Sequence, residues 1–129
     1  MIKKISNYTE EMMHQHEDDY SIEYVGNAHH YFSWLINQSD TIRKTRNPHN
    51  INTNIMTTKF GEPNFIDDYK ESSWWILSYK DNTWAVDTNE REGSGVHRFY
   101  NDKINRLGDK QNSIEMKEFV NELYDILLN

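Results

Sequence analysis

Histidine and carboxylate side chains lie closest together near the N-terminus, in the segment His14-Gln-His16-Glu17-Asp18-Asp19. Zinc and manganese accept both ligand types, so this segment could bind a divalent metal. On a helix, residues two apart point about 200° apart, so His14 and His16 could share an ion only on a strand or loop. His14 and Asp18 are four apart and could share one on a helix. We favour the other interpretation, a solvated acidic helix face without a metal.

The remaining histidines could supply a general base, and they are His29, His30, His49 and His97. The only Gly-Ser-Gly sequence, at 93–95, lacks the flanking residues of a hydrolase nucleophile elbow. The five glycines never take the spacing of a phosphate-binding loop. The sequence therefore indicates no catalytic residue and no cofactor, and it favours a protein that is not an enzyme. The enzymatic alternative is a metal-dependent hydrolase that uses His14, His16 and nearby carboxylates.

Further carboxylates occur at Asp67-Asp68 and at Asp87 with Glu90. Metal-dependent nucleases use sets of this composition, sometimes with a lysine, but Lys80 and Asp87 lack a supporting spacing. Asp87 equally suits the end of a strand. We interpret Asp67 and Asp68 as acids that contact a partner.

The segment Ser72–Thr88 holds three of the four tryptophans. Its two aromatic-rich runs flank Lys80-Asp81-Asn82, which predicts a β-hairpin at the centre of the fold. Trp and Tyr bury large areas and are enriched at interface hot spots. A chain with few aliphatic residues also needs its rings in the core. We therefore expect most rings to be buried, with at least one of Trp75, Tyr79 and Trp84 at the surface as a partner contact.

The hairpin register decides which rings share a face, because a slip of one residue reverses every side chain. A three-residue loop places Trp84 opposite Ser78, on the face of Trp74. A two-residue loop at Asp81-Asn82 places Trp84 opposite Tyr79, on the face of Trp75. Because Asp-Asn is a weak two-residue turn, we favour the three-residue loop with Asn82 left-handed.

Other elements follow from capping, periodicity and glycine placement. Thr9 caps a predicted helix at 10–19 whose interior side carries Met12, Met13 and His16. Residues 21–25 could form a short strand or equally continue this helix, with a break at Gly26-Asn27. We expect the other elements as follows: a helix at 28–44 whose end carries the basic segment 43–50, a strand at 51–60, a turn at 61–64 with Phe65-Ile66 anchored in the core, a loop at 89–95, a strand at 96–100, and a C-terminal helix at 114–128 capped by Ser113. These elements predict a single α+β domain, in which a small antiparallel sheet packs against two or three helices.

The chain has 129 residues, a formal net charge of -7 and no cysteine. Without cysteine, thiolate chemistry is excluded. No apolar run approaches the ~20 residues of a membrane span, so we expect a cytoplasmic protein that does not attach to membranes. Residues 10–23 carry six acids and no Lys or Arg, and residues 61–92 carry eight acids. An acidic balance disfavours direct binding to nucleic acid and favours a protein partner with a basic surface.

These features predict a small acidic binding protein that inhibits a partner by occluding it. The abundance of Asn, Ile and Lys is typical of AT-rich genomes such as those of low-GC bacteria and their phages. One specific form of the hypothesis is therefore an anti-defence protein of a phage or mobile element, such as an anti-CRISPR or anti-restriction factor that mimics nucleic acid. An immunity protein that neutralises a toxin is the alternative within the same class. The predicted contacts are Trp75, Tyr79, Trp84, Glu17, Asp18, Asp19, Asp67 and Asp68.

Overall fold

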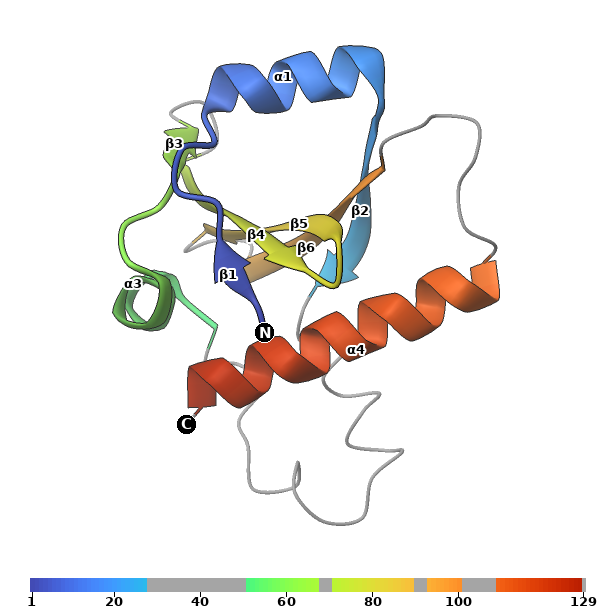
Figure 1. The fold of residues 1–129 in the computed structure, drawn as a ribbon. Helices are drawn as coiled ribbons and strands as arrows, with labels where there is room; N and C mark the ends of the chain where they lie inside the picture. Colours follow the sequence, from blue (N-terminus) through green and yellow to red (C-terminus); the bar gives the residue numbers. More distant parts are fainter. Residues whose placement is uncertain (28–50, 68–70, 90–92, 101–108, 129) are drawn as a thin grey trace, which may run out of the picture.

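The computed structural model describes residues 1–27, 51–67, 71–89, 93–100 and 109–128. Within these ranges the strands form one antiparallel sheet, and helices pack on both of its faces (Figure 1). The strands are β1 (Lys3–Lys4), β2 (Ser21–Asn27), β3 (Phe65–Asp67), β4 (Ser72–Tyr79), β5 (Asn82–Asn89) and β6 (Gly93–Tyr100). The predicted α+β class is confirmed, including the aromatic hairpin and the C-terminal helix. The predicted helix at 28–44 and the basic segment at 43–50 lie outside the described residues.

The sheet order is β1-β4-β5-β6-β2, and β3 also pairs with β4, so the hairpin lies at the centre as predicted. The two short strands share one side of β4: Lys3 lies opposite Ser78, and Phe65 lies opposite Trp74. At the other end of the order, β2 pairs with β6. The predicted break at Gly26-Asn27 is wrong, because both residues belong to β2 beyond a bulge between Tyr24 and Gly26.

The hairpin turn is Lys80-Asp81, one residue shorter than the favoured three-residue loop. Both residues have positive φ, 48° and 62°, as in a type I′ turn, and Tyr79 pairs directly with Asn82. Type I′ geometry matches the twist of the paired strands, and this outweighs the cost of placing Lys and Asp in the left-handed region. Neither predicted partner of Trp84 is correct, since it lies opposite Leu77. It shares the face of Trp75, as in the two-residue alternative.

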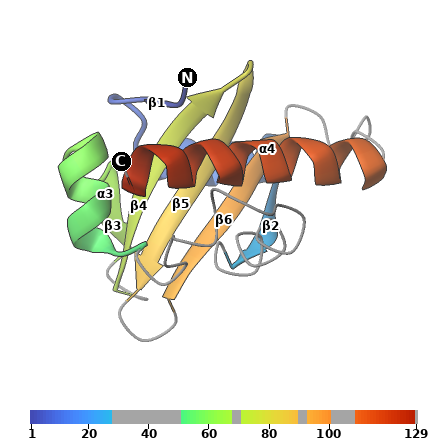
Figure 2. The ribbon, with the colours of Figure 1, turned by 90° about the horizontal axis from the view of Figure 1, so that it is seen from below.

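Helices cover the sheet on opposite sides (Figures 1 and 2). On one side α4 (Asp109–Leu128) crosses the strands, with α3 (Thr53–Phe60) beside it, and on the other side lies α1 (Glu10–Asp19). Alternation along β4 and β5 gives each face its own core. The α4 side buries Trp75, Leu77, Trp84, Val86, Val96, Phe119, Val120, Leu123, Tyr124 and Leu127, and the α1 side buries Met13, Ile76, Ala85 and Phe99. The hairpin is therefore apolar on both faces because it is covered twice.

The predicted strand at 51–60 is wrong, because this segment forms α3. Asn52 caps the helix, its side-chain oxygen accepting from the Ile55 N–H at 3.0 Å. Met56 is fully buried, and Ile55 and Phe60 pack against the same core. Gly61 ends the helix with φ 83°, a conformation that favours glycine. The alternation of Ile and Thr suggested a strand, but the cap and the helical spacing of the larger side chains prevail.

Two further boundaries and the burial of one side chain differ from the predictions. The C-terminal helix begins at Asp109, ahead of the predicted cap Ser113, and β6 begins at Gly93, inside the predicted loop. Ile66 is 54% exposed, so only Phe65 of that pair packs inward, stacked on Trp74 with ring centroids 6.0 Å apart.

Asn64 connects the N-terminal segment to the sheet. Its side-chain nitrogen donates to the carbonyls of Ile5 at 2.7 Å and Tyr8 at 3.1 Å, and its oxygen accepts from the Ile76 N–H at 2.8 Å. One amide therefore satisfies three backbone groups from two distant segments. The segment before α1, and hence the position of α1 on the sheet, depends on this residue.

Candidate functional site

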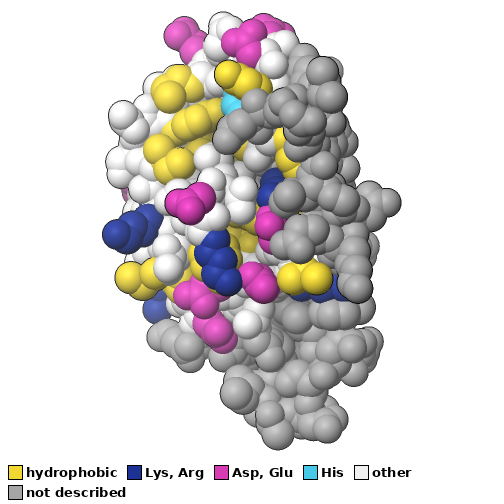
Figure 3. All heavy atoms as spheres, turned by 45° about the vertical axis from the view of Figure 1, so that its right-hand side comes forward, with side chains coloured by type: hydrophobic (Ala, Val, Ile, Leu, Met, Phe, Trp, Pro, Cys, Tyr) yellow, Lys and Arg dark blue, Asp and Glu magenta, His cyan; other side chains and the backbone are white. Residues whose placement is uncertain are grey.

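Helix α1 presents an acidic surface because its apolar side is narrow. Thr9 caps it as predicted, accepting from the Met12 N–H at 3.2 Å, and Met13 is buried against the sheet. Met12 is 44% exposed, which contradicts its predicted interior position. We define the α1 surface as the exposed residues Glu11, Met12, Glu17, Asp18, Asp19 and Tyr20. Figure 3 shows acidic side chains gathered at the top of the molecule, over α1 and near apolar side chains.

The two histidines of α1 lie on different sides of the helix and do not converge. His14 is solvent-facing, with ring nitrogens 3.7 Å from carboxylate oxygens of Glu10 and Glu17. His16 faces the sheet: its Nε2 lies 2.8 Å from the Tyr100 carbonyl oxygen, and its ring centroid lies 5.1 Å from that of Phe99. In the described part of the chain, no group of three or more His, Asp or Glu side chains has the arrangement of a metal site.

At least one of three rings was expected at the surface as a partner contact, and two of the three belong to the core. Trp75 and Trp84 have no exposed area, so neither ring can contact a partner in this fold. The indole N–H of Trp75 donates to the Gly61 carbonyl at 2.9 Å, and the Trp84 ring stacks on Phe119 at 4.5 Å with an interplanar angle of 3°. Tyr79 is half-buried near the hairpin tip and is the remaining candidate contact.

Of the other predicted carboxylates, the structure describes Asp67 and Asp87, whereas Glu90, like Asp68, lies outside the described residues. Asp67 ends β3 and is half-buried. Asp87 pairs with His97, its Oδ1 lying 3.2 Å from Nε2, on the α1 side of the sheet. Lys80 lies at the far end of the hairpin and pairs with Glu118.

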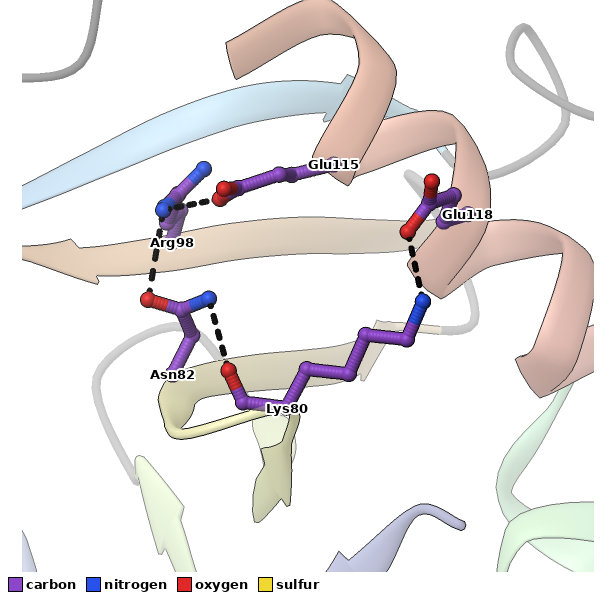
Figure 4. A network of polar contacts seen from close by, with 5 residues as sticks. All are labelled: Lys80, Asn82, Arg98, Glu115 and Glu118. Atoms are coloured by element: carbon purple, nitrogen blue, oxygen red, sulfur yellow. Dashed lines mark hydrogen bonds and ion pairs between the residues drawn. The ribbon is translucent and has the colours of Figure 1, made fainter. Parts of the chain in front are cut away.

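A polar network joins the hairpin tip to α4, and sequence reasoning missed it (Figure 4). Arg98 projects from β6, is 2% exposed, and forms an ion pair with Glu115 of α4. Its guanidinium carbon lies 5.0 Å from the Trp84 ring and 5.1 Å from the Tyr100 ring. Arg98 also donates a hydrogen bond from Nη2 to the Asn82 side-chain oxygen at 3.2 Å. The alternation Val96, Arg98, Tyr100 was the available signal, since it placed Arg98 on an apolar face.

Lys80 extends the network to the surface. Its Nζ lies 2.9 Å from Glu118 Oε2 and 5.4 Å from the Tyr79 ring centroid. The hydrogen bond to Glu118 raises the pKa of Lys80. The Asn82 side-chain nitrogen donates to the Lys80 carbonyl at 3.2 Å, which fixes the turn that carries the ammonium group.

This network borders a cavity of ≈ 220 Å³, which we call the tip cavity, between the hairpin tip and α4. Its lining residues are Tyr79, Lys80, Asn82, Trp84, Glu115 and Glu118. Aromatic rings and carboxylates are the groups with which proteins bind organic cations. The described residues thus offer two surfaces for binding, the α1 surface on one side of the sheet and the tip cavity on the other.

Comparison with protein families, with characterised proteins and with solved structures finds no match for this chain. Among the described residues, no helix is both long and apolar enough to cross a membrane.

Proposed function

We propose that this chain is a small acidic binding protein that occludes a basic surface on a protein partner through its α1 surface. The observation that carries the proposal is the charge of that surface. Glu11, Glu17, Asp18 and Asp19 are all exposed on one short helix, and the helix contains no lysine or arginine. A concentration of one sign of charge attracts a complementary surface and accelerates encounter.

Apolar area next to these acids supports a contact that goes beyond long-range attraction. Met12 and Tyr20 are 44% and 41% exposed on the same helix and its C-cap. Tyrosine and methionine are enriched in protein interfaces, where they supply buried area that charges alone do not. A basic nucleic-acid channel of a partner would be a suitable binding site for the acids and the exposed apolar area of the α1 surface. The anti-defence role predicted from the sequence is the narrower form of this proposal.

The experiment is a pull-down from nuclease-treated lysate of a low-GC bacterium, read by mass spectrometry. The test variant is Glu17→Lys/Asp18→Lys/Asp19→Lys on the α1 surface. The matched control is Glu62→Lys/Asp81→Lys/Glu122→Lys, which reverses three acids outside α1. Three changes of two charges each move the formal net charge from -7 to -1 in both variants. The comparison therefore separates the position of the charges from their number.

We expect the wild type and the control variant to enrich one lysate protein that the α1 variant does not enrich. Equal loss with both variants would show that only total charge matters. Enrichment that survives the α1 variant unchanged would exclude the α1 surface as the binding site.

A further inference from the structure

Two cations of the chain contact residues that line the tip cavity, and each contacts an aromatic ring and a carboxylate. Arg98 lies against the Trp84 ring and pairs with Glu115. Lys80 lies against the Tyr79 ring and pairs with Glu118. Each cation thus has at least one aromatic ring and one carboxylate, and both kinds of group attract a positive charge.

The two cations differ in how firmly they are held. Arg98 is 2% exposed and contacts two rings, Glu115 and Asn82, so it is held firmly behind the lining residues Trp84 and Glu115. The Lys80 side chain is 61% exposed, and that of its partner Glu118 is 45% exposed. An exposed ion pair contributes little stability and exchanges readily with solvent. Glu118 and Tyr79 are therefore available to another cation whenever Lys80 swings away.

We propose that the tip cavity binds an alkylguanidinium group, which takes the place of the Lys80 ammonium on Glu118 and Tyr79. A guanidinium is planar, donates two parallel hydrogen bonds to one carboxylate and stacks on an aromatic face, whereas an ammonium is a compact point charge. The exchange replaces one positive charge by another, so the charge of the site is conserved. The cavity lies on the opposite side of the sheet from α1, and this inference is independent of the proposed function.

Two sources can supply this chemistry, a free small molecule or the arginine side chain of a polypeptide. The experiment is a titration of the ¹⁵N-labelled protein, followed by two-dimensional NMR, with three probes. Agmatine represents the free molecule, N-acetyl-L-arginine N-methylamide represents a peptide arginine, and butylamine is the ammonium control. We expect saturable shifts at the amides of Tyr79, Asn82 and Glu118. Tighter binding of the peptide mimic assigns the site to a polypeptide, and tighter binding of agmatine assigns it to a small molecule.

Variants test the geometry. Glu118→Gln should weaken guanidinium binding about tenfold or more, because a charge-assisted bidentate contact is lost. Glu122→Gln is the matched control on the same helix and should bind like the wild type. Lys80→Asn removes the competing cation, so it should tighten guanidinium binding by up to about fivefold. Asn is chosen because it tolerates the positive φ of this position. Thermal unfolding of each variant checks that it is folded.

Three results would overturn the inference. The first is the absence of saturable shifts with both guanidinium probes. The second is equal affinity of wild type and Glu118→Gln. The third is binding of butylamine as tight as that of the guanidinium probes, which would remove the chemical selectivity.

Discussion

Removing one partner of the ion pair between Arg98 and Glu115 should be one of the most destabilising single substitutions in the protein. Replacing Glu115 with Ala leaves a guanidinium that is 2% exposed without its carboxylate. Breaking a buried pair from one side typically costs about 3–5 kcal/mol. The Glu115 side chain is 22% exposed, and Arg98 keeps Asn82 and two aromatic rings, so we expect the lower end, about 3 kcal/mol.

A double-mutant cycle of Arg98 and Glu115 substitutions measures the coupling energy of the ion pair, apart from the contacts that each residue makes with other groups. Replacing both residues by Met fills the space with apolar groups, and such replacements are often close to neutral. The double variant should therefore be more stable than Glu115→Ala, despite carrying more changes. Glu115→Gln keeps an acceptor without the charge and should fall between wild type and Glu115→Ala.

Urea unfolding followed by tryptophan fluorescence and far-UV circular dichroism measures these free energies. Trp84 contacts Arg98 and is one of the four tryptophans that contribute to the emission, so the signal includes the site. A loss below about 0.5 kcal/mol for Glu115→Ala would be typical of a surface contact and would refute the buried-pair account. Additive effects of the Arg98 and Glu115 substitutions would refute it as well, because coupled partners are not additive.

Three further predictions concern the fold. Asn64→Ala should destabilise the protein by about 2–4 kcal/mol in urea unfolding, because three hydrogen bonds to backbone groups are lost. A loss under about 1 kcal/mol would contradict this role. Asp81→Gly should be about 1 kcal/mol more stable than Asp81→Ala, because glycine tolerates φ 62° and alanine does not; equal stabilities would contradict the turn assignment. Burial raises the pKa of Tyr124. Above pH ~10 the unfolded state therefore loses a proton that the folded state keeps. The free energy of unfolding should then fall by about 1.4 kcal/mol per pH unit. Tyr124→Phe should reduce this alkaline loss, and identical alkaline profiles for wild type and Tyr124→Phe would contradict the assignment.

Local signals predicted those elements whose ends and faces are both marked in the sequence. The helix at 10–19 has a threonine cap and acids in its first turn, and α1 has these bounds. The hairpin was predictable because two aromatic runs flank a short polar stretch. The apolar stripe of the C-terminal helix identified its buried residues, including Phe119 and Leu123, although its start was misplaced.

The errors arose where tertiary structure overrides local preference. The Lys80-Asp81 turn has residues that disfavour positive φ, so no local rule selects it over a longer loop. In α3, Ile and Thr have β propensity, but the buried Met56 and the Asn52 cap make the segment helical. Propensity decides such a segment only when packing does not.

The polar network could not be predicted because its members are far apart in the sequence. Arg98 meets Glu115 across the gap between β6 and α4, and Lys80 meets Glu118 thirty-eight positions later. Such pairings depend on where the helix crosses the sheet. The acidic character of α1 is different, because it follows from composition and a single cap and was therefore predictable.

If the α1 surface binds a basic partner through its charge, the binding must depend on the salt concentration. The measurement is the affinity of the captured partner at several salt concentrations, for wild type, the α1 charge-reversal variant and the matched control. The account predicts that affinity falls steeply with salt for wild type and control, and that the α1 variant binds weakly with a shallow dependence. The same slope for all three proteins would contradict it.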